Sequence, residues 1–89
     1  MKAPTNNLQE VLLTMIEQGE VSIMDFPYLS GFRTRVSELV LEHGLAICSE
    51  QRKGTNKFGR TFTYAVHSAL IPDQAIELYN KLKEYENKH

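Results

Sequence analysis

Residues 29–39 read Leu-Ser-Gly-Phe-Arg-Thr-Arg-Val-Ser-Glu-Leu, a turn signal followed by the start of an amphipathic helix. The apolar residues recur at intervals of three and four, which places them on one helix face: Phe32, Val36, Leu39 and Val40. We expect a helix over residues 31–43, with Ser30 as its N-cap. His43 and Gly44 form a favourable last turn and stop.

A second amphipathic segment precedes this helix. Its apolar stripe consists of Leu8, Val11, Leu12, Met15 and Ile16. One of residues 5–7 can cap its start, and Gly19 ends it. Residues 20–26 are too short for a pattern to decide between strand and helix. Val21 and Ile23 alternate as in a strand, whereas Ser22 and Asp25 can cap a short helix. We expect a brief strand that passes into one helical turn before Pro27.

Two strands follow, at residues 45–49 and 61–66. In the second strand Phe62, Tyr64 and Val66 alternate with small residues, so these three side chains should share one face of the sheet. The residues between the strands, 50–60, read as a hairpin loop with two glycines and four positive charges. Phe58 in this loop is expected to pack back on the sheet; the alternative is that it stacks on a base.

The last periodic segment predicts a helix over residues 73–86, beginning near Pro72 or Asp73. Its predicted buried residues are Ala75, Ile76, Tyr79, Leu82 and Tyr85. The tail at residues 86–89 should fray. The helix either closes the core of a monomer or offers a contact surface to a second copy or a protein partner.

The order of these elements over residues 8–66 resembles the winged helix-turn-helix fold, a three-helix core with a β-hairpin wing. Residues 29–39, 43–47 (His-Gly-Leu-Ala-Ile) and 59–64 (Gly-Arg-Thr-Phe-Thr-Tyr) look like small phage and prophage helix-turn-helix proteins. The resemblance implies an α+β fold with a single domain over residues 1–89. It also implies that the second helix of the pair enters the DNA major groove and that the hairpin is the wing.

The side chains on the predicted helix suit DNA. Arginine can pair bidentately with guanine O6 and N7, and Ser and Thr can bond to bases or phosphates. The candidates near the helix start are Ser30, Arg33, Thr34, Arg35 and Ser37. Arg33 and Ser37 share a face, whereas Arg35 is turned by about 200° from Arg33, so one of the arginines is expected to bind phosphate. The alternative is a solvated face on which Arg35 pairs with Glu38 or with neighbours on the side of Glu42.

The predicted wing, residues 52–60, contains four cations and no acid. The repulsion between these cations is relieved when a polyanion binds. Each phosphate that is neutralised adds nearly one unit to the slope of log K against log salt for DNA binding. The candidate phosphate contacts are Arg52, Lys53, Asn56, Lys57 and Arg60. The alternative is a hairpin tip kept soluble by its charge, since lysine at a sheet edge also discourages strand pairing.

The formal net charge of the chain is −1, but its distribution is uneven. Residues 30–72 hold six bases and three acids, a net of +3, while residues 1–29 have a net of −3 and residues 73–89 a net of −1. A basic middle between acidic ends orients a domain on a duplex and limits indiscriminate attachment.

Several classes of function are excluded by what the sequence lacks. No apolar run approaches the length of about 20 residues that a membrane span needs. The single cysteine, Cys48, indicates a reducing, cytoplasmic compartment and is expected to be a small core or sheet residue. The three histidines have no metal-ligand spacing, and no catalytic motif occurs. We therefore expect no enzyme activity, cofactor, metal or small-molecule substrate.

The sequence thus predicts sequence-specific binding of double-stranded DNA by a small transcriptional or phage-type regulator. Residues 31–43 would read the major groove and residues 52–60 would hold the phosphate backbone. Residues 73–86 are the candidate surface for a homodimer or a protein partner, because one module offers little DNA interface. The alternative is a winged-helix module that binds proteins and not DNA.

Overall fold

Three α-helices and a three-stranded antiparallel sheet are formed by residues 2–87, the part of the chain that the computed structural model describes. The fold is therefore of the α+β class, as predicted. A short 3₁₀ helix, η1, follows the first strand. In chain order the elements are α1 (Asn7–Gln18), β1 (Val21–Ser22), η1 (Ile23–Asp25), α2 (Phe32–Leu41), β2 (Ile47–Thr55), β3 (Thr61–Ala69) and α3 (Pro72–Asn87).

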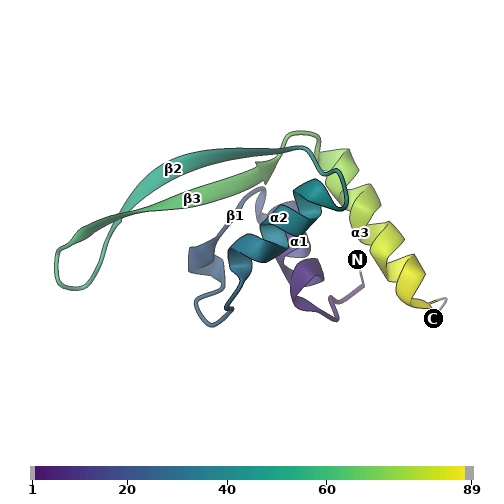
Figure 1. Cartoon of the computed structure of the whole chain (residues 1–89), viewed down its shortest axis with the longest axis horizontal. Coiled ribbons are helices and arrows are strands. Elements are labelled where there is room, and N and C mark those ends of the chain that lie inside the picture. The colour runs from purple at the N-terminus through teal and green to yellow at the C-terminus, as the bar shows by residue number, and fades with distance from the viewer. Residues whose placement is uncertain (1, 88–89) are drawn as a thin grey trace.

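The sheet has the order β1-β3-β2, and most of it is a long hairpin. Strands β2 and β3 pair from Ile47↔Ala69 to Thr55↔Thr61, whereas β1 pairs only two of its residues with β3. Figure 1 shows the hairpin projecting well beyond the helices, which gives the molecule extents of 49 × 25 × 22 Å. The predicted loop over residues 50–60 is wrong. The strands continue to Thr55 and restart at Thr61 because backbone pairing extends through residues that are polar on both faces.

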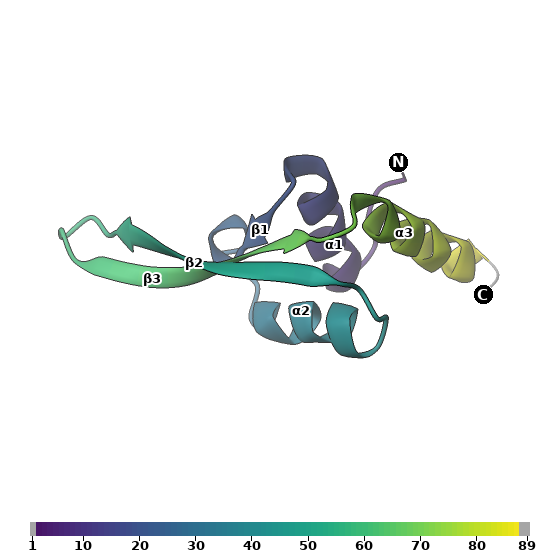
Figure 2. The same cartoon turned by 90° about the horizontal axis from the view of Figure 1, so that it is seen from above.

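The core lies between the helices and the base of the hairpin. In Figure 1, α1 and α2 both lie below the hairpin, and in Figure 2, seen from above, they appear on either side of it. The apolar stripes predicted for the two helices are confirmed at their centres, since Val11, Leu12, Met15, Phe32, Val36 and Leu39 are all buried. Helix α1 is capped by the Asn6 side chain and ends at Gly19, as expected.

The start of α2 differs from the prediction. Ser30 is not the N-cap, because Gly31 occupies that position with a φ of +84° and no side-chain cap bond is made. The helix ends at Leu41 and not at His43. Leu45 N–H donates to Leu39 O at 2.9 Å across Gly44, whose φ is +68°, so the chain turns at this glycine after the helix has ended.

Between the two helices, the predicted strand and helical turn are both present. Ser22 accepts a hydrogen bond from Met24 N–H, and Asp25 accepts one from Ser22 N–H at 2.9 Å, which completes a capping box on η1. Only three residues are helical here, so the segment before α2 is mostly a turn.

Helix α3 lies at the end of the molecule away from the hairpin tip, packs on α1 and β3, and buries Ala75 and Tyr79 in the core. Leu82 is half-buried, but Ile76 and Tyr85 are exposed, which corrects the prediction for those two. The helix continues through Glu86 to Asn87, so the predicted fraying at residue 86 is wrong; residues 88 and 89 lie outside the described part of the chain.

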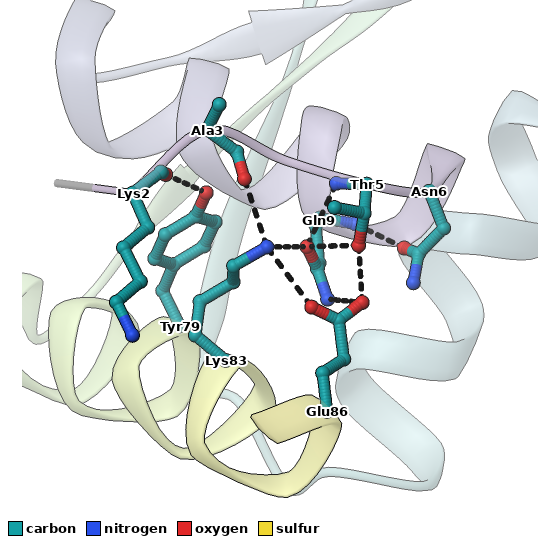
Figure 3. A network of polar contacts seen from close by, with 8 residues as sticks. All are labelled: Lys2, Ala3, Thr5, Asn6, Gln9, Tyr79, Lys83 and Glu86. Atoms are coloured by element: carbon teal, nitrogen blue, oxygen red, sulfur yellow. Dashed lines mark hydrogen bonds and ion pairs between the residues drawn. The ribbon is translucent and has the colours of Figure 1, made fainter. Parts of the chain in front are cut away.

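A network of polar contacts ties residues 2–5, here called the N-terminal strap, to α3 (Figure 3). Tyr79 donates its hydroxyl hydrogen to Lys2 O, and Lys83 Nζ donates to Ala3 O at 2.8 Å. Lys83 is only 8% exposed, and its charge is balanced by Glu86 at 2.9 Å. The buried charge is thus compensated by an ion pair and a backbone carbonyl.

Gln9 joins the strap to α1. Its Oε1 accepts from Thr5 N–H at 3.0 Å and from Lys83 at 3.1 Å, and its Nε2 donates to Glu86 at 3.0 Å. Glu86 also accepts from the Thr5 hydroxyl, and the hydrogen bonds from Thr5 and Lys83 lower the pKa of this carboxyl. Both ends of the buried Gln9 amide are therefore hydrogen-bonded. The Glu86 carboxylate is held in place by Thr5, Gln9 and Lys83.

None of the helices within residues 2–87 combines the length and the apolar character needed to cross a membrane.

Candidate functional site

A groove separates α2 from the side of the hairpin that faces the helices. Its volume is about 520 Å³, and it is lined by residues of α2, by one residue of β2 and by residues of β3; Val36 and Tyr64 belong to this lining. We call it the α2–hairpin groove and define it by Arg33, Ser37, Gln51, Thr63, Ala65 and His67. The strand register explains this set, because Gln51 is paired with Ala65 and directly opposed residues project to the same face.

Lys53 extends the same face toward the tip. It is opposite Thr63 in the register, two residues beyond Gln51, and is exposed. Thr34 is exposed on α2 beside Arg33 and Ser37. Arg33 and Lys53 make no ion pair with any of the residues 2–87. The structure therefore brings together one predicted helix cation and one predicted hairpin cation on one side of the molecule.

Arg35 is placed differently from Arg33. It is half-buried and forms an ion pair with Glu38, with Nη2 to Oε1 at 2.6 Å, while its Nε is buried without a hydrogen-bond partner. This is the alternative pairing weighed from the sequence. Ser30 lies exposed in the turn before Gly31, outside the helix.

Arg52 lies on the opposite face of the hairpin from Lys53. Its guanidinium contacts Glu20 at 2.7 Å and Glu50 at 2.6 Å. Hydrogen bonds to Glu20 and then to Glu50 raise the pKa of Arg52. Glu20 belongs to the connection between α1 and β1, so Arg52 links the hairpin to the helical body and does not line the groove.

An aromatic contact stiffens the outer half of this opposite face. Gly54 is paired with Phe62, and a Cβ at residue 54 would lie 2.6 Å from the Phe62 ring. The ring therefore covers the glycine directly, and its centroid is 5.9 Å from that of Tyr64. Aromatic cover of a strand glycine is one of the devices that stabilise a hairpin.

The tip of the hairpin is an ordered turn over residues 56–60. Gly59 N–H donates to Asn56 O at 3.0 Å and Gly59 has a φ of +81°, the arrangement of a type I turn followed by a left-handed glycine. The Asn56 side chain accepts from Phe58 N–H and from Arg60 N–H, both at 2.9 Å. Asn56, a predicted DNA contact, therefore uses its side-chain oxygen inside the turn.

Lys57, Phe58 and Arg60 are exposed around this turn. The Lys57 ammonium lies 5.2 Å from the centroid of the Phe58 ring. The prediction that Phe58 packs on the sheet is wrong, since 79% of the residue is exposed. The turn geometry directs its two central residues outward and leaves the ring without a surface to cover.

His67 lies at the inner end of the α2–hairpin groove. Its ring is 6.1 Å from the Phe32 ring, and its Nδ1 is 2.7 Å from Ser49 Oγ. Burial lowers the pKa of this histidine. Neutral His67 is therefore favoured in the folded protein at neutral pH.

This lowered pKa predicts that the protein loses stability in mild acid. The unfolded state, with a histidine pKa near 6.5, binds the proton more readily than the folded state. The stabilisation is thus complete above about pH 6.5 and declines as the pH falls from there through the folded-state pKa. Urea unfolding between pH 7.5 and pH 5 should show this decline, and His67→Gln should flatten it. His43→Gln, at an exposed position, is the matched control; an equal slope in both variants would contradict the assignment.

The remaining candidates do not form a site for chemistry. Cys48 is exposed on β2, which corrects the core alternative for this residue. No group of three histidine, cysteine or acidic residues in the part of the chain that the structure describes could hold a metal ion.

Sequence reasoning missed Gln51 and Thr63 as groove residues because β2 was predicted to end at residue 49. If the alternation of side chains along β3 is continued onto a longer β2, Gln51 and Thr63 fall on the same face of the hairpin.

In comparisons with known proteins, no protein-family model, no curated protein and no solved structure matches this chain.

Proposed function

We propose that this chain is a winged helix-turn-helix protein that binds double-stranded DNA sequence-specifically, as a small transcriptional or phage-type regulator. Helix α2 would lie in the major groove, and the β2–β3 hairpin would contact the phosphate backbone. The element order and the sheet order β1-β3-β2 are compatible with such a fold. The departure is the first helix of the pair, which is reduced to η1 and a turn.

The observation that carries the proposal is the shared orientation of α2 and the hairpin. Arg33 and Ser37 of α2 border the same groove as Thr63, the cross-strand partner of Lys53. A helix can enter the major groove while an adjacent hairpin follows the backbone only if both face the same side. Arg33, Thr34 and Ser37 are all exposed there and available for base edges or phosphates.

The cations without an ion pair suit a helix that reads bases and a hairpin that binds phosphates. With Arg35 and Arg52 held by glutamates, the exposed cations near the proposed interface are Arg33, Lys53, Lys57 and Arg60. Contacts from two to four of these cations predict a slope of log K against log salt of about −2 to −4. With so few phosphate contacts, one copy of the chain is expected to bind DNA with modest affinity.

Fluorescence anisotropy with a labelled random-sequence duplex tests the proposal. Binding should be measurable at low ionic strength and should weaken between 50 and 200 mM salt with about this slope. Selection of bound sequences from a random pool should then enrich a short motif. Undetectable duplex binding at low salt would remove the DNA function, and binding without enrichment would remove sequence specificity.

A protein-binding module is the second candidate, and one observation favours it. Three large apolar side chains are exposed between residues 70 and 76, where β3 connects to α3: Leu70, Ile71 and Ile76. Exposed apolar side chains grouped in this way are typical of protein contacts. This candidate gains support if duplex binding is absent at low salt while Leu70→Asp lowers the mass of an assembly measured by light scattering.

A further inference from the structure

Phe58 is the most unusual side chain of the hairpin. The ring is 79% exposed at the end of two nine-residue strands, at the part of the molecule farthest from α3 (Figure 1). No other apolar side chain stands in the turn at residues 56–60. A phenylalanine exposed here adds nothing to the core and leaves its ring available for contact with a binding partner.

The turn presents this ring in a fixed way. Phe58 N–H is bonded to Asn56 Oδ1, and the next residue is the left-handed Gly59. The two strands behind the turn are in continuous register to Thr55↔Thr61. The hairpin in turn is linked to the helical body by the contact of Arg52 with Glu20. A ring presented on such a support loses little conformational freedom on binding.

The surroundings of the ring are cationic. Lys57 lies over the ring, Arg60 follows it by two residues, and no acid occurs between residues 51 and 72. An aromatic face beside lysine and arginine matches a nucleobase attached to phosphates. An anionic lipid surface offers similar charge, but peripheral binding to lipid scales with buried apolar area, and one ring supplies little. The combination therefore favours a nucleic acid.

We propose that Phe58 is a stacking residue that inserts at interruptions of the base stack in DNA, such as an unpaired nucleotide. This inference rests on the proposed function, because the duplex flanking the interruption would be held by α2 and the cations of the hairpin. The inference adds a preference for DNA that contains an unpaired nucleotide. The hairpin tip would recognise this feature independently of the base sequence that α2 contacts.

The gain from stacking and the cost of opening a base step together favour insertion at an interrupted stack over insertion into an intact duplex. Stacking of one base on an aromatic side chain is equivalent to about fivefold to 150-fold in affinity. Opening an intact base step costs an amount of the same order, so insertion into a perfect duplex yields little. Where a base is already unpaired this cost is largely absent. Affinity should then rise by at least about fivefold over the matched intact duplex.

The experiment compares two duplexes that differ only by one unpaired adenine, with 2-aminopurine beside it as a fluorescent reporter of stacking. The full chain should bind the bulged duplex at least about fivefold more tightly and change the 2-aminopurine signal. Phe58→Ala should lose this preference while changing affinity for the intact duplex by less than about twofold. Phe58→Tyr should retain it, and Leu70→Ala, an exposed apolar residue away from the tip, should behave as the unaltered chain does.

The outcomes separate this inference from the proposed function. Binding to both duplexes with equal affinity, or a preference that survives Phe58→Ala, overturns the inference and leaves duplex binding intact. Binding to the bulged duplex alone supports the inference and overturns the duplex function. Absence of binding to either DNA overturns both. Binding to phosphatidylserine vesicles that depends on Phe58, without a preference for the bulge, assigns the tip to lipid and also overturns the inference.

Discussion

Arg33→Ala is expected to reduce the sequence preference of DNA binding by about fivefold to 150-fold, whereas Lys53→Ala weakens binding to all sequences alike. Arg33 is exposed in the first turn of α2 and borders the α2–hairpin groove. A bidentate contact from arginine to guanine contributes about 1–3 kcal/mol of discrimination against the wrong base. Lys53 lies on the hairpin, where a single ammonium can neutralise a phosphate without reading a base.

Anisotropy titrations with the selected sequence and with a scrambled sequence measure this difference. The ratio of the two affinities should collapse for Arg33→Ala and stay unchanged for Lys53→Ala. For Lys53→Ala the salt slope should become shallower by about one unit. Lys81→Ala, which removes an exposed cation from α3, is the matched control and should alter neither quantity. If Arg33→Ala and Lys53→Ala lower both affinities equally, the assignment of base reading to α2 is wrong.

Tyr79→Ala is expected to remove about 3–5 kcal/mol of the free energy of unfolding, a large share of the stability of a small domain. Tyr79 is 0% exposed and belongs to the same buried cluster as Leu12 and Leu39. Removing its ring leaves a cavity in the core beside α1, on which α3 packs. Tyr79→Phe keeps the ring and loses only the hydroxyl bond to Lys2 O, so its cost should be about 1 kcal/mol.

Urea unfolding followed by far-ultraviolet circular dichroism compares these variants. Leu41→Ala, at a position that is 82% exposed, is the control and should stay within about 0.5 kcal/mol of the unaltered chain. Equal stabilities of Tyr79→Ala and Leu41→Ala would show that α3 does not close the core. In that case residues 73–86 would regain their alternative role as a contact surface alone.

The helices could be predicted from the sequence because each buries one continuous stripe. The period of 3.6 residues is visible at Val11, Leu12 and Met15 and again at Phe32, Val36 and Leu39, all of which are buried. The length of the hairpin could not be predicted in the same way. Beyond Ser49, β2 is exposed or half-exposed on both faces, so no alternation of apolar and polar residues marks it as a strand.

The candidate site was only partly predictable for a related reason. Exposure of Arg33, Thr34 and Ser37 follows from their places on the helix, and the pairing of Arg35 with Glu38 follows from a local spacing of three. Arg52 is different, because its partner Glu20 is 32 residues away in the sequence. Such a contact depends on where β1 lies relative to the hairpin, which no local pattern encodes.

The N-terminal strap has a consequence for how the chain reaches its folded state. Its contacts join partners that are 77 to 81 positions apart, from Tyr79 with Lys2 to Glu86 with Thr5. Contacts of such high sequence separation require closure of a loop that includes most of the chain, and they form late in folding. During synthesis, these contacts and the packing of α3 on α1 therefore form only after α3 has left the ribosome.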